Sequence, residues 1–321
     1  MIIPVGEGDH LDTGLILDTI PVTLYTPWSR PPVHLALEVL VVALGVLTFV
    51  HAWRARRAGD LLPLFTWLTI FIYGVAMEIL SYNFVDNFVH AQFTVMFYHR
   101  KLPLYVTAVY PTLLYTGIAT VRRFRFPVWA EGFAAGLFIV ALDVPFDIVG
   151  PCEKWWSWSR TDAVLAYRWF GVPVTSYYWH LAFGGILAAL TRAIAPHLRS
   201  PRQLVLAMPA ALMTIVLGVV AFLPLHGLAK MGVSHGITVA FAWTVSIGVL
   251  LMAPKKHVAE PDWLLLAFPT TFALFHLVVA WRAVEGGGIG MVGLDIGFIA
   301  TVVAAAHEST FARFRRKPVG E

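Results

Sequence analysis

Charged residues are scarce in this chain. Asp, Glu, Lys and Arg make up 13% of its 321 residues, about half their usual share in a soluble domain. Apolar residues reach 58%, and the mean hydropathy is +0.73. A water-soluble chain of this size needs a polar shell, which this composition cannot supply. We therefore predict an integral membrane protein.

Cysteine is also nearly missing. Cys152 stands alone, which excludes an intrachain disulfide and a Cys-x-x-Cys motif for zinc binding or redox exchange. The first residues, MIIPVGEGDHLDTG, have no basic segment followed by an apolar core, so we expect no cleaved signal peptide. The net charge of +4 comes from short basic clusters between apolar runs, which argues against a nucleic-acid partner.

Long apolar runs dominate what is present. A helix needs roughly 20 apolar residues to cross a hydrocarbon core about 30 Å thick. Because the runs show no strict alternation, we predict an all-α fold, a polytopic transmembrane helical bundle of about nine spans. The predicted spans are 34–53, 61–82, 102–121, 127–149, 173–194, 203–222, 235–253, 262–281 and 287–306.

Basic residues predict the orientation. Most of the 23 Lys and Arg residues lie in alternate loops and in the C-terminal tail, and such loops are typically cytoplasmic. The N-terminus is therefore predicted outside and the C-terminus inside. We expect an extracytoplasmic segment (1–33), a transmembrane domain (34–306) and a basic cytoplasmic tail (307–321). The predicted location is a bacterial cytoplasmic (inner) membrane or an equivalent plasma membrane, with membrane lipids as partners.

Ionisable side chains gather near the predicted outer ends of the spans. Glu78 and Tyr82 close the second span, and Asp86 and His90 follow at the same four-residue spacing. If the helix continues through the loop, all four side chains share one face. Ionisable groups inside a span cost about 2.5–3.5 kcal/mol each and mark a functional path or a paired contact.

A second polar group comes from the fourth and fifth spans. Asp143 and Asp147 stand one helical turn apart, and His180 opens the next span. Neighbouring buried carboxylates repel, so they share a proton or bind a cation. A shared proton makes a general acid–base pair. A cation makes a divalent metal site, with Asp143, Asp147, His90 and His180 as ligands. Pro145, between the aspartates, is expected to kink the helix.

A purely structural reading of the aspartates stays open. Asp143 and Asp147 could pair with an outer-side arginine, for which the candidates are Arg100, Arg160 and Arg168.

The segment 83–101 is too polar to span the membrane, and we expect it to lie along the interface or to re-enter the membrane.

The second outer loop is rich in tryptophan, which favours the headgroup region. These rings form either an interfacial belt or a lid over a cavity open to lipid. Under the second reading we assign substrate binding to Tyr82, Trp155, Trp156, Trp158, Arg168, Trp179 and His180.

The stretch from residue 78 to about residue 193 resembles an uncharacterised family of multi-pass membrane proteins, a domain of unknown function. The resemblance implies a membrane-helical fold and no particular reaction. The motifs that carry it include Asp86-Asn-Phe-Val-His90, Asp143-Val-Pro-Phe-Asp147, Trp155-Trp-Ser-Trp158, Gly171-Val-Pro173 and Ser176-Tyr-Tyr-Trp-His180. A weaker resemblance links the acidic span end, the Trp-x-Trp loop and Gly-Val-Pro to carotenoid-biosynthesis hydratases, and it implies addition of water to an isoprenoid.

Our leading hypothesis is a membrane-embedded, hydratase- or cyclase-like enzyme acting on a lipid or isoprenoid. Asp143 and Asp147 would be its acid–base pair. Glu78 or Asp86, with His90, would complete the proton relay. Two alternatives stay open: a proton- or cation-coupled transporter or receptor, and a metal-dependent membrane lipid hydrolase. The sequence leaves the oligomeric state open.

Overall fold

The computed structural model describes residues 15–19, 22–85, 87–159, 165–254 and 262–284, together with Gly293, Ile296 and Gly297. Within these residues the chain is mostly helical, and helices occupy the first eight predicted spans. The helices are α1 (Pro32–Arg57), α2 (Leu62–Leu80), α3 (Leu104–Tyr110), α4 (Thr116–Arg122), α5 (Val128–Cys152), α6 (Val174–Ile194), α7 (Ala207–Lys230), α8 (His235–Met252) and α9 (Trp263–Val284). Apart from Gly293, Ile296 and Gly297, the predicted ninth span lies outside the described residues, and so does the basic tail.

Six helical segments among the described residues are long and apolar enough to cross a membrane. They are Pro32–Arg57, Leu62–Val85, Leu104–Arg122, Val128–Cys152, Pro201–Lys230 and His235–Met252. This finding supports an integral membrane protein. The number of nine spans and the orientation stay predictions. Helix α6 is not one of the six, and its first turns carry the polar and aromatic run Thr175-Ser-Tyr-Tyr-Trp-His180.

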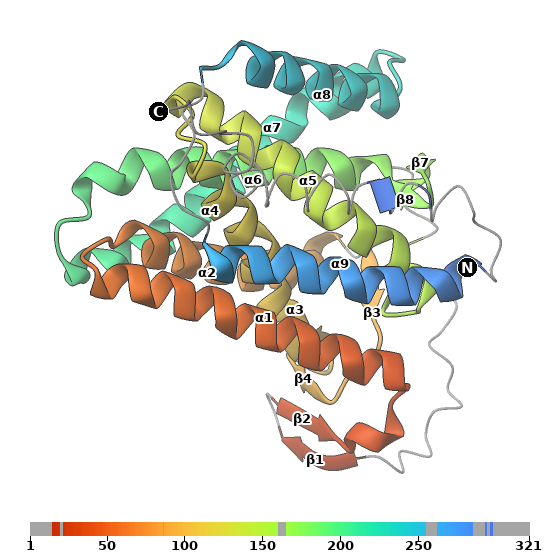
Figure 1. Cartoon of the computed structure of the whole chain (residues 1–321). Helices are drawn as coiled ribbons and strands as arrows, with labels where there is room; N and C mark the ends of the chain where they lie inside the picture. Colours follow the sequence, from red (N-terminus) through yellow and green to blue (C-terminus); the bar gives the residue numbers. More distant parts are fainter. Residues whose placement is uncertain are drawn as a thin grey trace, which may run out of the picture.

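Helix α5 lies at the centre of the bundle, in contact with α4, α6, α8 and α9 (Figure 1). Its closest neighbour is α6, because two glycines let the backbones approach. A Cβ atom on Gly136 would lie 2.4 Å from the carbonyl oxygen of Leu181, and one on Gly132 would lie 3.0 Å from that of Gly185. Small residues four apart are typical of tightly packed membrane helices.

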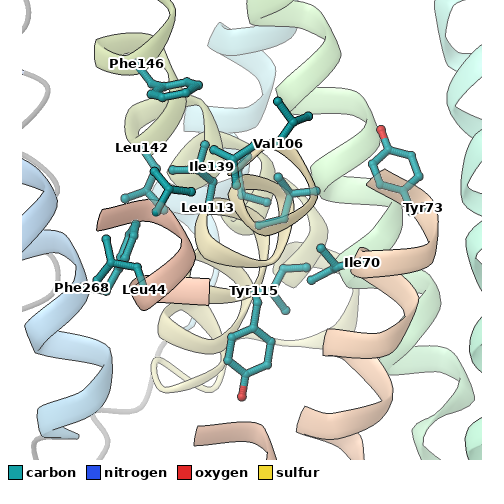
Figure 2. Close-up of a cluster of buried hydrophobic side chains, with 14 of the residues drawn as sticks. Leu44, Ile70, Tyr73, Val106, Leu113, Tyr115, Ile139, Leu142, Phe146 and Phe268 are labelled. Carbon is teal, nitrogen blue, oxygen red and sulfur yellow. The ribbon is translucent and has the colours of Figure 1, made fainter. Parts of the chain in front are cut away.

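Apolar side chains fill the space around α5. Figure 2 shows Leu44 of α1, Leu142 of α5 and Phe268 of α9 on one side of this core, all of them buried. In the same view Val106 and Leu113 approach α5 from the third predicted span. That span is not one regular helix, because a π-helical turn at Pro111–Tyr115 separates α3 from α4.

One guanidinium group ties four helices together at the end of the bundle where α4 stops. Arg122 donates from Nε to Glu131 of α5 at 2.9 Å. Its other two nitrogens donate to Thr66 of α2 and Thr191 of α6, each at 2.8 Å. Arg192 adds a longer contact of 3.6 Å to Glu131. Because Glu131 is only 3% exposed, these arginines supply the positive charge that its burial requires.

Short strands form in the loops between the helices. Two of them, β3 (Phe88–His90) and β4 (Val95–Phe97), lie in the 83–101 segment that we expected to be interfacial or re-entrant. Strand β3 pairs antiparallel with β6 (Trp156–Trp158). Strands β1 (Leu15–Thr19), β2 (Val22–Tyr25), β4 and β5 (Leu102–Pro103) form a four-stranded sheet in that order. A third pair joins β7 (Arg168–Trp169) to β8 (Val172–Pro173). Figure 1 shows the β1–β2 hairpin beyond the start of α1.

Replacing Arg122 with methionine should destabilise the fold by about 3–5 kcal/mol, because it leaves Glu131 buried without its closest cation. The measurement is thermal unfolding of purified protein in detergent. Arg192→Met is the matched control, since that side chain is 42% exposed and should cost about 1 kcal/mol or less. Equal losses in the two variants would contradict the assignment. Adding Glu131→Gln to Arg122→Met should restore part of the stability.

Candidate functional site

A cavity of about 320 Å³ lies between α2, α3, α5 and α6, covered by the β3–β6 pair. Its size lies within the usual range of small-molecule sites. Most of its walls are apolar or aromatic, and the polar groups form two clusters. The lining residues include Glu78, Asn87, Phe88, His90, Tyr105, Tyr110, Asp143, Phe146, Asp147, Trp156, Trp158, Thr175, Ser176, Trp179, His180, Phe222 and His226.

The first cluster surrounds Glu78, which is 4% exposed. Its carboxylate accepts hydrogen bonds from the Tyr82 hydroxyl at 2.5 Å and the Tyr110 hydroxyl at 2.7 Å. His90 Nε2 lies 3.3 Å from the same carboxylate, and His90 Nδ1 lies 3.3 Å from the Tyr105 hydroxyl. The cluster therefore joins residues of α2, α3 and β3 around one carboxylate in the cavity wall.

His90 reaches Glu78 by a route that the helical spacing did not predict. A continuous helix through the loop is wrong: α2 ends in a π-helical turn at Ser81–Val85. The chain then reverses into β3, where His90 lies opposite Trp156. Asp86, predicted as part of the same stripe, lies outside the described residues.

The second cluster joins α5 to α6. His180 Nε2 lies 2.8 Å from Asp143 Oδ2, and Ser176 donates to Asp147 Oδ2 at 2.5 Å. The His180 contact has the length of an ion pair but not the geometry of a hydrogen bond, so Asp143 Oδ2 has no hydrogen-bond partner. Both aspartates are buried. Helix α5 is continuous across Pro145, so the chain does not unwind there, and the kink expected at this proline stays a prediction.

Charge compensation by arginine was the structural alternative for the aspartates. Instead, their described partners are His180 and Ser176. Arg168 donates to the carbonyl oxygen of Gly171 and lines a neighbouring pocket with Trp156 and Trp158. Arg160, the other candidate in that loop, lies outside the described residues.

The predicted substrate-binding tryptophans divide into two groups. Trp156, Trp158 and Trp179 line the cavity. Trp155 is fully buried and packs against Phe146, so it belongs to the core rather than to the described cavity wall. The difference arises because successive side chains of an extended segment point in opposite directions. Tyr82 contributes through its hydrogen bond to Glu78.

Sequence reasoning missed several polar contributors. Tyr105 and Tyr110 come from the third predicted span, where nothing in their spacing pointed to Glu78 or His90. Ser176 carried a usable signal, since it precedes His180 by one helical turn and therefore shares its face.

Three of the four predicted metal ligands meet. One ligand atom from each of Asp143, Asp147 and His180 lies within 4.8 Å of the others. His90 is not part of this group, because β3 directs it to Glu78. Two carboxylates and one imidazole are a donor set that Zn²⁺ or Mn²⁺ accepts. Asp143 Oδ2, which accepts no hydrogen bond among the described residues and contacts His180, also fits a cation ligand.

These features define a multi-pass membrane protein with a polar cavity among its helices. The chain belongs to the family described as Domain of unknown function (DUF7802), whose model matches residues 26–262. This confirms the predicted resemblance to an uncharacterised membrane family. No curated protein and no solved structure matches the chain. The resemblance to carotenoid-biosynthesis hydratases therefore has no support from the comparisons.

Gly150→Ala should distort the cavity wall. A Cβ atom at Gly150 would lie 1.9 Å from the Trp156 ring, so the indole must move. We expect a loss of about 1–3 kcal/mol in unfolding free energy from this overpacking, measured by thermal unfolding. Gly248→Ala on α8 is the control, because nothing lies within 4 Å of its added methyl group. An unchanged stability of Gly150→Ala would contradict this packing.

Proposed function

We propose that this protein is a membrane-embedded enzyme that acts on a lipid or isoprenoid by carboxylate acid–base chemistry. The observation that carries the proposal is the position of Asp143 and Asp147, one turn apart and buried in the wall of a largely apolar cavity. Its location in a bacterial inner membrane, or an equivalent plasma membrane, is part of the same proposal.

The paired carboxylates supply both halves of a proton transfer. Two carboxylates this close in an apolar site favour a state with one shared proton. One aspartate of the pair acts as the acid and the other as the base. Ser176 donates a hydrogen bond to Asp147. His180 contacts Asp143 and orients it.

A balanced reaction follows from this assignment. The protonated aspartate gives its proton to a carbon–carbon double bond, which leaves a carbocation on the neighbouring carbon. Water adds to that cation, and its extra proton passes to the other aspartate, so the pair ends with as many protons as it began with. Ring closure would instead return a proton from carbon to that second aspartate. The faces of Trp156, Trp158 and Trp179 stabilise positive charge that develops beside them.

The gathering of carboxylates around one cavity favours an enzyme over a conduit. A proton or cation pathway needs polar groups distributed through the depth of the membrane. Here Glu78, Asp143 and Asp147 all line the same cavity.

Asp143→Asn and Asp147→Asn should each abolish turnover while the protein still folds, because each removes one member of the acid–base pair. Purified full-length protein is incubated with a total lipid extract, and mass spectrometry identifies compounds that change. We expect losses of about 10²-fold or more. Asp60→Asn, an exposed carboxylate at the start of α2, is the control and should keep full activity. Full activity in both cavity variants would refute the assignment.

A second candidate function is metal-dependent lipid hydrolysis. It is favoured because one ligand atom from each of Asp143, Asp147 and His180 lies within 4.8 Å of the other two. A divalent ion there would polarise an ester or amide carbonyl and activate water. Glu78 and His90 lie in the same cavity and could take up the released proton.

Elemental analysis of purified protein distinguishes the two candidates. Hydrolysis predicts about one bound Zn²⁺ or Mn²⁺ per chain, lost in His180→Ala and kept in His226→Ala, whose ring lines the cavity outside the three-residue group. A sample that contains no metal and retains turnover would exclude metal-dependent hydrolysis and favour acid–base catalysis.

A further inference from the structure

A second pocket, of about 470 Å³, shares two tryptophans with the cavity. We call it the Arg168 pocket. Its described lining includes Trp156, Ser157, Trp158, Ser159, Ala166 and Arg168. Because Trp156 and Trp158 line both spaces, a molecule that lies along strand β6 contacts the pocket and the cavity at once.

The Arg168 pocket is lined by hydrogen-bond donors. A guanidinium carries five N–H groups and no acceptor, and an indole carries one N–H group. Trp158 Nε1 is buried and has no hydrogen-bond partner among the described residues. Ser157 and Ser159 add two hydroxyl groups, and the described lining of this pocket contains no carboxylate. The pocket is therefore suited to an anion with several acceptor oxygens.

A tight hairpin holds Arg168 in position. The pairing of β7 with β8 leaves only Phe170 and Gly171 between the two strands. Their φ angles of 52° and 82° are typical of a type I′ turn. The Arg168 side chain donates to the carbonyl oxygen of Gly171 at 3.1 Å. A side chain that is ordered before binding loses less conformational freedom when a ligand arrives.

The cavity supplies the apolar surface that the Arg168 pocket lacks. Aromatic side chains form much of its wall, namely Phe88, Phe146, Trp156, Trp158, Trp179 and Phe222. Hydrocarbon chains gain about 25 cal/mol for each Å² of apolar surface that they remove from water. A free phosphate ion would use the Arg168 pocket alone and leave these rings uncovered.

We infer that the protein binds a lipid with a phosphate head, placing the head in the Arg168 pocket and the hydrocarbon chain in the cavity. Phosphate and guanidinium can form two parallel hydrogen bonds, which a lysine cannot reproduce. The inference names the substrate class of the enzyme proposed above. It rests on that function only for the role of the chain beside the aspartate pair.

Binding of simple ligands tests the head and the chain separately. Purified full-length protein in a neutral detergent is titrated with dodecyl phosphate, dodecanol or inorganic phosphate, and tryptophan fluorescence reports occupancy. Dodecyl phosphate should bind about tenfold or more tightly than dodecanol, as expected for charged hydrogen bonds. It should also bind more tightly than inorganic phosphate, because only the amphiphile covers the apolar walls.

Three variants assign these effects to their residues. Arg168→Gln should remove the preference for phosphate over alcohol and leave dodecanol binding unchanged. Lys154→Gln is the matched control: it removes the same charge from the same loop, but Lys154 is exposed and lines neither space, so the preference should stay. Trp179→Ala changes the cavity and not the pocket, so it should weaken dodecyl phosphate and dodecanol by the same factor.

Equal affinities for dodecyl phosphate and dodecanol in the wild type would overturn the inference, and so would a phosphate preference that survives Arg168→Gln. Inorganic phosphate that binds as tightly as dodecyl phosphate would also overturn it, in favour of a site for the free ion. Should Arg168→Gln fail to fold, Ala166→Glu places a carboxylate at an exposed position of the pocket wall. It should abolish the phosphate preference, whereas Ala166→Gln should keep it.

These outcomes are independent of catalysis. The titrations measure no turnover, and Arg168→Gln leaves the aspartate pair intact, so a failed phosphate preference leaves the acid–base function standing. Turnover that persists in both Asp143→Asn and Asp147→Asn would reject that function and leave the phosphate preference untouched.

Discussion

The arrangement of the cavity depends on the largely buried guanidinium of Arg122. Through Glu131, Thr66 and Thr191 it links α4 to α5, α2 and α6. Those same helices carry Glu78, the aspartate pair and His180. A planar group with five fixed donors can satisfy three partners in set directions, which a lysine cannot. The polar side chains of the cavity are thus held by an electrostatic junction at the other end of the helices that bear them.

The sequence predicted the parts of the site that depend on residue spacing within a single helix. Asp143 and Asp147 share a face because residues four apart always do. Long apolar runs similarly located the helices. The meeting of Glu78 with His90 was expected for the wrong reason. A π-helical turn and a strand bring them together, and neither leaves a periodic pattern. The family membership was also visible from motifs alone.

What the sequence could not supply is contact between distant segments. Tyr110 donates to a carboxylate 32 positions away, and nothing local marks it. Trp155 and Trp156 are identical residues side by side, yet one fills the core and the other lines the cavity. The Gly132–Gly136 spacing was readable as a helix-packing motif, but its partner on α6 emerges only from the packing of the two helices.

The pairing of β3 with β6 fixes both the position of the segment after α2 and the direction in which its side chains point. His90 lies opposite Trp156, while its neighbour Val89 is half exposed. A slip of one residue would interchange the two faces of the strand and turn the imidazole outward. A single-residue insertion or deletion within Phe88–His90 would therefore be more damaging to the cavity wall than one in the connection that precedes Phe88, which can leave the pairing in place. The register of the strand, more than the length of the connection, is what keeps the imidazole inside the cavity.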